Sequence, residues 1–123
     1  MIQYVTTKIV SAWPEARQDI PGYAVEYADG YRSWCPKDKF REVAIALGPI
    51  SHLEPYQQRT IAELAQLIER MDTLERFLTT GNPAETIGLV ESLLLIEQLE
   101  VMQEYAVVLR KRVKVFNAPK VTE

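Results

Sequence analysis

The sequence predicts an α+β protein, in which a small N-terminal antiparallel three-stranded β-sheet with a short helix precedes a long antiparallel α-helical hairpin that oligomerises. Three observations support this fold class. Residues 1–50 are rich in β-branched and aromatic residues and in turn signals. Residues 51–118 hold two segments of helical apolar period, separated by a Gly-Asn-Pro turn. The second segment carries more apolar surface than one partner helix can bury.

The N-terminal segment predicts a first strand in IQYVTTKIVSAW and a β-hairpin in YAVEYADGYRSW. The dipeptide Asp29-Gly30 between the two runs of the hairpin is a strong signal for a two-residue turn. Pro36 ends the second hairpin strand. The stretch PKDKFREVAIAL then predicts a short helix, which Pro36 opens and Gly48-Pro49 stops. About 50 residues in this arrangement can form only a small core.

The first long helix is predicted in PYQQRTIAELAQLIERMDTLERFL, which contains no internal glycine or proline. Its apolar positions alternate at spacings of four and three, as in a heptad pattern. These positions are Thr60, Leu64, Leu67, Met71, Leu74 and Leu78. The turn TTGNP follows, in which Gly81 is expected to cap this helix and Pro83 to open the next one.

The second long helix is predicted from Pro83 to Phe116, roughly 50 Å at 1.5 Å per residue. One apolar stripe along it comprises Leu95, Leu99, Met102, Ala106, Leu109, Val113 and Phe116. A second stripe on a neighbouring face comprises Ile87, Val90, Leu94, Val101, Tyr105 and Val108. A two-helix hairpin buries one stripe per helix, so the second stripe needs another partner. This stripe extends beyond what the small sheet can reach, whereas a second copy of the chain can cover it. We therefore expect an obligate oligomer.

The composition argues against several classes of protein. Hydrophobic residues make up 47% and charged residues 25%, and no apolar run approaches the ~18 residues of a membrane span. The single cysteine, Cys35, and the single histidine, His52, are too far apart in the sequence to predict a metal site. No phosphate loop or nucleophilic triad is visible. We therefore expect no enzymatic activity, no metal and no cofactor.

The charge is unevenly distributed along the chain. Residues 1–50 are neutral, residues 51–106 carry a net −7 and residues 107–123 a net +4, which sum to −3. An acidic protein is a poor general binder of nucleic acid, since duplex affinity arises mainly from phosphate neutralisation. We therefore expect no nucleic-acid partner, and any bound anion should be small and locally held.

Four basic residues crowd the stretch YAVVLRKRVKVF, and they allow two interpretations. Cations in the last turns of a helix gain about 0.3–1 kcal/mol each from the helix dipole, which explains one or two of them. The alternative is an anion site, because Arg112 shares a helix face with Tyr105 of the second stripe. Basic walls around an aromatic floor at a protomer boundary would suit a small nucleotide-like anion.

Phe77 also has two interpretations. It follows Arg70 by two helical turns, and a ring beside a guanidinium can stack a base and hold a phosphate. Aromatic residues at helical spacing are, however, more often part of the core. On the residues alone, the core interpretation of Phe77 is favoured.

Two stretches resemble a known family. The segment GYAVEYADGYRSWCPKDKFRE resembles the N-terminal motif of phage anti-Thoeris proteins, with a Gly-Tyr strand, an Asp-Gly turn and the pattern S-W-x-P-K-x-x-F. LIERMDTLERFL with IEQLEVMQEYAVVLRKRV is similar to the helical hairpin that this family shares with phage anti-CBASS cyclic-nucleotide sponges. The matching hairpin positions are Arg70, Leu74, Phe77, Leu78, Gln98, Leu99, Met102, Tyr105, Leu109, Arg112 and Val113. Their order in one chain resembles the first type of anti-Thoeris protein.

The resemblance implies a non-enzymatic sponge in the host cell cytoplasm that holds a cyclic ADP-ribose isomer and silences Thoeris signalling, with cyclic di- or trinucleotides as further ligands. Members are dimers or hexamers with pockets between protomers. By position, Phe77 would stack on the ligand, Arg110 and Arg112 would grip the diphosphate or ribose, and Met102 and Tyr105 would line an apolar wall. The turn TTGNPAET departs from the family pattern, and Asn82 would supply a polar contact there. The alternative is a structural oligomerising helical module without a nucleotide ligand.

Overall fold

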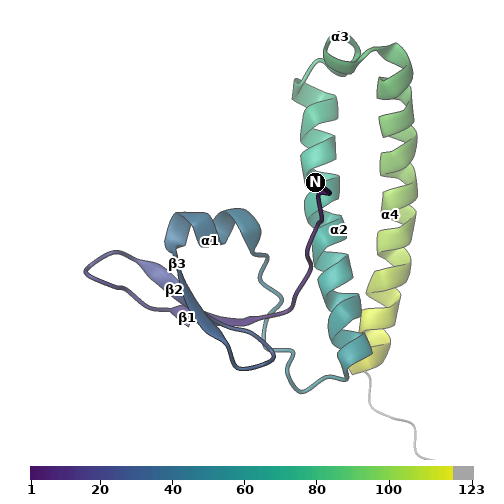
Figure 1. Ribbon diagram of the computed structural model, residues 1–123. Coiled ribbons are helices and arrows are strands. Elements are labelled where there is room, and N and C mark those ends of the chain that lie inside the picture. Colours follow the sequence, from purple (N-terminus) through teal and green to yellow (C-terminus); the bar gives the residue numbers. More distant parts are fainter. Residues whose placement is uncertain (118–123) are drawn as a thin grey trace, which may run out of the picture. The chain divides into compact units, whose positions relative to one another are not determined.

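The structure, a computed structural model, describes residues 1–117. The chain divides into two compact units, Met1–Ala46 and Leu47–Glu123. The predicted α+β class is confirmed, since a three-stranded antiparallel sheet comes first and long paired helices follow (Figure 1). Residues 119–123, for which the sequence predicts a flexible tail, lie outside the described residues.

The sheet has the strand order β1-β2-β3, with β1 at Ser11–Pro14, β2 at Gly22–Glu26 and β3 at Arg32–Pro36. Both pairings are antiparallel. The first strand is shorter than the sequence predicted, because residues 1–10 form no strand despite their β-branched composition. The register explains this, since Ser11 pairs with Glu26 and β2 ends there. Residues before Ser11 therefore have no partner strand.

The turn between β2 and β3 contains three residues where the sequence predicted two. The N–H of Tyr27 donates to the carbonyl of Tyr31, and the N–H of Gly30 donates to the carbonyl of Tyr27, both at 2.9 Å. Ala28, Asp29 and Gly30 form the loop, and Gly30 has a φ of 91°. This is a turn completed by a glycine bulge, so Gly30 provides the positive φ after the turn.

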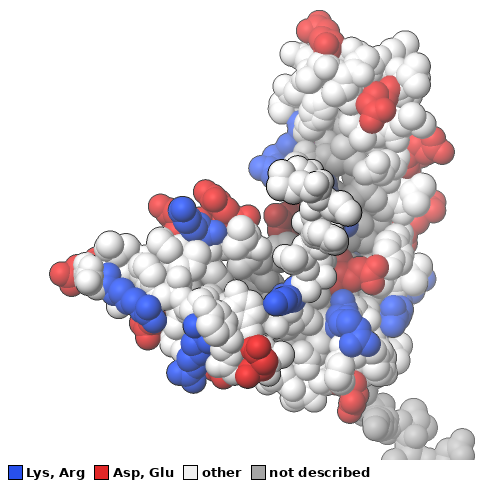
Figure 2. Space-filling model, viewed as in Figure 1, with Lys and Arg blue, Asp and Glu red and all other residues white. Residues whose placement is uncertain are grey.

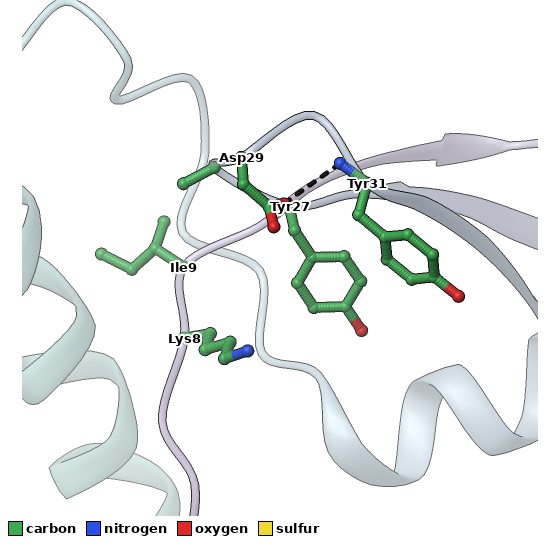
Figure 3. Close-up of a pocket in the computed structure, with 6 residues that line it drawn as sticks. Lys8, Ile9, Tyr27, Asp29 and Tyr31 are labelled. Carbon is green, nitrogen blue, oxygen red and sulfur yellow. Dashed lines mark hydrogen bonds between the residues drawn. The ribbon is translucent and has the colours of Figure 1, made fainter.

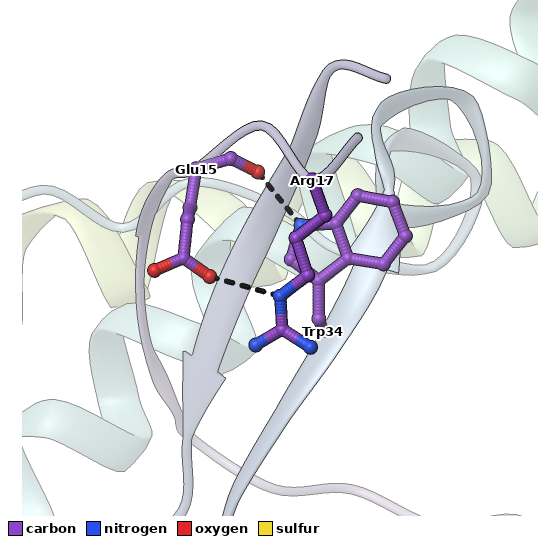
Figure 4. Close-up of polar contacts among 3 residues, drawn as sticks. All are labelled: Glu15, Arg17 and Trp34. Carbon is purple, nitrogen blue, oxygen red and sulfur yellow. Dashed lines mark hydrogen bonds and ion pairs between the residues drawn. The ribbon is translucent and has the colours of Figure 1, made fainter. Parts of the chain in front are cut away.

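Trp34 stabilises the sheet from its third strand. Its indole Nε1 donates to the carbonyl of Glu15 at 2.7 Å (Figure 4). Arg17 lies over the indole ring at 5.6 Å and pairs with the Glu15 carboxylate at 3.2 Å. Gly22 makes this packing possible, because a Cβ at this position would overlap the indole. The ring therefore lies directly against the backbone of β2.

Helix α1, Lys37–Val43, packs on the sheet through one aromatic pair. The rings of Phe40 and Tyr23 are stacked, with centroids 4.3 Å apart. The helix ends earlier than predicted, since Ala44 is already extended at φ −114°. Val43 is exposed, so a further helical turn would have had no surface to cover.

The hairpin consists of α2, Pro55–Thr80, and α4, Leu89–Asn117, which lie antiparallel and side by side (Figure 1). Glu54 and Gln57 form a capping box at the start of α2. The first predicted stripe of α4 faces α2, and Ala106 and Leu109 are fully buried. Around them the core contains Leu67, Leu64, Met71 and Met102. No helix within residues 1–117 combines the length and hydropathy of a membrane span.

The prediction of a single helix from Pro83 to Phe116 is wrong at the N-terminal end. Pro83–Ile87 forms a separate short helix, α3, and Gly88 interrupts the chain with a φ of 88°. The N–H of Gly88 closes α3 by donating to the carbonyl of Ala84 at 3.1 Å. The Ser92 hydroxyl donates a hydrogen bond to the Gly88 carbonyl at 2.6 Å and so anchors the first turn of α4. Only glycine adopts this conformation without strain, which explains the break.

Candidate functional site

The second stripe of α4 is uncovered. Tyr105 is 43% exposed, Val101 59% and Val90 74%, although all three belong to one apolar face. Ile87, Leu94 and Val108 on the same face are also exposed. Soluble chains rarely leave a contiguous apolar strip in water, so this face marks an interaction surface.

A groove lies along this face with a volume of about 530 Å³. Its walls are formed by Leu94, Glu97, Gln98, Val101, Met102 and Tyr105. Two of the residues predicted for the site, Met102 and Tyr105, are thus brought together. Gln98 is oriented beside them by a contact of 3.7 Å between its Nε2 and the Met102 sulfur. The groove is mainly apolar, and its charged lining residue is the acid Glu97.

Tyr105 connects the groove to α2. Its hydroxyl donates to Oε1 of Glu63 across the hairpin. This hydrogen bond is the main cause that raises the pKa of Tyr105, while the positive charge of Arg112 acts in the opposite direction. Arg112 therefore lies close enough to influence this pair electrostatically. Sequence reasoning missed Glu63, because only the register of α2 against α4 shows that it reaches Tyr105.

The basic cluster is at the end of α4 farther from the turn. Arg110, Lys111, Arg112 and Lys114 are all exposed. Within residues 1–117, none of them has a carboxylate oxygen within 4.0 Å, since the ion pairs found there are Arg17–Glu15 and Arg32–Glu26. Arg112 lies 5.9 Å from the centroid of the Phe116 ring, a cation–π contact. Figure 2 shows acidic side chains around the α3 end of the hairpin and both basic and acidic ones toward its other end.

Phe77 and Asn82 lie at the turn end of the hairpin. Phe77 is half-buried near the end of α2, and its ring packs against Gly81, where a Cβ would come within 2.6 Å of the ring. Asn82 has a left-handed backbone with φ 47°, and its carbonyl accepts hydrogen bonds from the N–H groups of Glu85 and Thr86. These observations give both residues a structural role at the turn.

One chain does not bring the predicted site residues together. Phe116 contacts Tyr56 in α2, with ring centroids 5.8 Å apart. Phe77 follows Tyr56 by about 32 Å along α2, and Arg112 precedes Phe116 by about 6 Å along α4. Phe77 and Arg112 are therefore roughly 25 Å apart along the hairpin axis. Met102 and Tyr105 lie between them, so the residues form three separate groups.

A second hollow lies within the N-terminal unit, with a volume of about 620 Å³ (Figure 3). Lys8 lies 5.4 Å from the centroid of the Tyr27 ring, and Asp29 accepts a hydrogen bond from the Tyr31 N–H at 3.1 Å. The Asp29 carboxylate offsets the charge of Lys8, and no predicted site residue lines this hollow. The groove on α4 is therefore the better candidate. Within residues 1–117, no cluster of three or more metal-ligating side chains occurs.

These features define the second unit as an α-helical hairpin with an uncovered apolar groove and a separate cluster of cations. Comparison with protein families then identifies the particular family: the Sequestin model matches residues 54–115, half of the chain, and the chain belongs to this family. The family's name denotes sequestration, which fits the sequestering role that the resemblance implies. Searches among curated proteins and among solved structures found no match.

Proposed function

We propose that this protein is a phage anti-defence sponge that binds a cyclic ADP-ribose isomer without cleaving it and thereby blocks Thoeris signalling in the host cell cytoplasm. Membership of the Sequestin family and the resemblance of the hairpin support this proposal. The observation that carries it is the uncovered groove between Met102 and Tyr105, near cations that have no carboxylate partner within residues 1–117.

A second copy of the chain completes the site in this proposal. The groove of one chain offers an apolar wall but no cation in its lining, so it cannot hold a diphosphate alone. The acidic residues of α4 precede position 105, and its basic residues follow position 109. A parallel pair of α4 helices would place like charges side by side, whereas an antiparallel pair places acids opposite bases. Charge complementarity therefore favours the antiparallel pair.

The register of such a pair follows from the hairpin itself. Since Tyr56 lies level with Phe116, Phe77 lies level with Leu95 on α4. The midpoint between Leu95 and Arg112 falls between Met102 and Tyr105. An antiparallel pair centred between Met102 and Tyr105, at the C-terminal end of the groove, would place Arg112 of one copy level with Phe77 of the other. The three separate groups would then form two equivalent sites, each with a ring, an apolar wall and guanidinium groups.

Sequestration without chemistry requires tight binding and no turnover. A cyclic ADP-ribose carries about two negative charges, and two or three arginines balance them without making the protein generally basic. Nanomolar affinity corresponds to about −12 kcal/mol. Burial between two preformed hairpins would favour this affinity, because few groups must be ordered on binding.

The decisive experiment tests capture and release. The protein is incubated with cyclic ADP-ribose isomers, freed of unbound ligand and heat-denatured, and the released compound is identified by mass spectrometry. Release of the intact isomer supports the proposal. Release of a converted product would indicate an enzyme. Absence of any captured ligand would overturn the sponge and favour a structural oligomerising module, for which the exposed stripe is equally suited.

Cyclic di- and trinucleotides, the signals of CBASS defence, are a further proposed ligand class, and the same experiment examines them. A competition arm decides whether they share the site. If a saturating cyclic trinucleotide leaves the amount of captured cyclic ADP-ribose unchanged, a second kind of site exists. If each displaces the other, one site takes both.

A further inference from the structure

The Tyr105–Glu63 hydrogen bond places a carboxylate beside a site proposed for an anion. Among residues 1–117, it is the one side-chain to side-chain hydrogen bond that joins α2 to α4. A site that bound phosphate alone would gain nothing from a negative group at its edge, since the group would repel the ligand. A carboxylate is useful where the ligand also presents hydrogen-bond donors.

Glu63 has acceptor capacity to spare. Tyr105 occupies Oε1, and within the described residues Oε2 has no hydrogen-bond partner and no cation within 4.0 Å. The phenolic oxygen of Tyr105 can accept a further hydrogen bond, since a hydroxyl both donates and accepts. Gln98 lies in the same groove, with its amide nitrogen directed to the Met102 sulfur. The groove itself is lined by the Glu97 carboxylate and the Gln98 amide, and the Tyr105 hydroxyl joins this lining to the Glu63 carboxylate.

We propose that Glu63, held in place by Tyr105, reads the ribose hydroxyl groups of the ligand and makes the groove selective for ribose over deoxyribose. This inference rests on the proposed function and deepens it. The vicinal hydroxyls of a ribose are paired donors, and a carboxylate accepts such hydrogen bonds strongly because it is charged. The arginines would bind the diphosphate, and Glu63 would accept hydrogen bonds from the sugar hydroxyls. A ligand without the hydroxyl leaves the carboxylate unpaired and binds more weakly.

The exocyclic amino group of adenine also carries hydrogen-bond donors, and the Glu63 carboxylate could accept from it instead of from the ribose. Three ligands separate the two sources: the cyclic ADP-ribose isomer that the wild-type protein captures, its 2′-deoxyribose analogue and its inosine analogue, which lacks the amino group. Isothermal titration calorimetry on the full chain gives the three affinities. The ratio of parent to deoxy affinity is the measure of ribose selectivity, and a purely structural role of Glu63 does not change it.

In the wild-type protein we expect the parent to bind on the order of tenfold more tightly than the deoxy analogue, from a hydrogen bond to a charged group. Glu63→Ala should reduce this ratio to near one and leave the ratio of parent to inosine analogue unchanged. Glu63→Gln keeps the shape and one acceptor oxygen, so it should retain part of the selectivity. Glu75→Ala, an exposed acid of the same helix that does not accept a hydrogen bond from Tyr105, is the matched control and should change neither ratio.

Tyr105→Phe removes the hydrogen bond but keeps Glu63, and it should weaken the selectivity less than Glu63→Ala. If the parent-to-deoxy ratio of Glu63→Ala and Glu63→Gln equals that of the wild type, the inference is wrong although the sponge stands. If Glu63→Ala instead reduces the ratio of parent to inosine-analogue affinity to near one, the carboxylate binds the base, and the ribose assignment is wrong. If the wild-type protein captures none of the ligands, the proposed function itself fails.

Discussion

The rings of Tyr56 and Phe116 meet edge to face, with centroids 5.8 Å apart and planes at 88°. The contact joins the first turn of α2 to the last turns of α4 and closes the open end of the hairpin. Phe116 also lies beneath the guanidinium of Arg112. One aromatic pair therefore fixes both the helix register and the position of a cation that we propose to bind the ligand.

Phe116→Ala should lower the free energy of unfolding by about 2 kcal/mol, through lost burial and the lost edge contact. It should also weaken ligand capture, because Arg112 loses its support. Urea denaturation followed by circular dichroism gives the stability, and Tyr56→Phe is the control that keeps both rings. A Phe116→Ala protein as stable as the Tyr56→Phe protein would show that the aromatic pair does not hold the hairpin closed.

Val101→Glu should dissociate the proposed oligomer while leaving the hairpin folded. Val101 is 59% exposed in one chain, so the substitution costs little there, but it would place a carboxylate in the middle of the proposed interface. We expect the dissociation constant to rise at least a hundredfold, about 3 kcal/mol. Analytical ultracentrifugation measures this, with circular dichroism to confirm helicity. Gln103→Glu, exposed outside the stripe, is the control, and equal behaviour of the two variants would place the interface elsewhere.

The stability should depend on pH through Tyr105. The hydrogen bond to Glu63 raises the pKa of this phenol above its ordinary value of 10.0 in the folded state. Above pH 10 the unfolded chain has released a proton that the folded chain retains, so stability falls as pH rises through the folded pKa. Below pH 10 the contribution is constant. Unfolding free energies between pH 8 and 11 should thus decline more steeply for the wild type than for Tyr105→Phe, and parallel curves would contradict the hydrogen bond.

Gly81→Ala should disturb Phe77 without straining the backbone. Gly81 has a φ of −93°, which alanine adopts, but the added Cβ would come within 2.6 Å of the Phe77 ring and 2.8 Å of its carbonyl oxygen. We expect a loss of about 1–3 kcal/mol in stability. Ligand capture should weaken as it does in Phe77→Ala. Thr80→Ala, next to the glycine, is the control, and wild-type capture by Gly81→Ala would show that the position of the ring is unimportant.

The helical pattern predicted the hairpin well because its apolar spacing is long and regular. The stripe through Ala106 and Leu109 faces α2 as expected, and Gly81 ends α2. The break at Gly88 was missed, since an isolated glycine within a helical pattern does not reveal its φ. The β-branched residues before Ser11 predicted a strand that does not form, because strand propensity cannot show whether a partner strand is present.

The candidate site could be predicted only in part. Met102 and Tyr105 belong to adjacent stripes of one helix, so the sequence placed them near each other, and the groove contains both. Glu63 could not be found, because its partner is on another helix and depends on register. The separation of Phe77 and Arg112 could not be predicted either. Positions that match a motif do not show how far apart two residues lie along a hairpin.

The uncovered stripe has a consequence for how much signal the protein could neutralise. If each site needs two chains, the number of sites rises with the square of the chain concentration when chains are scarce and becomes proportional to it only above the dissociation constant. Early in an infection, a small pool of single hairpins would hold almost no signal. Once the pool passes that concentration, nearly every added chain contributes to binding. The protein would then act with a threshold in dose, set by the affinity of one helix face for its copy.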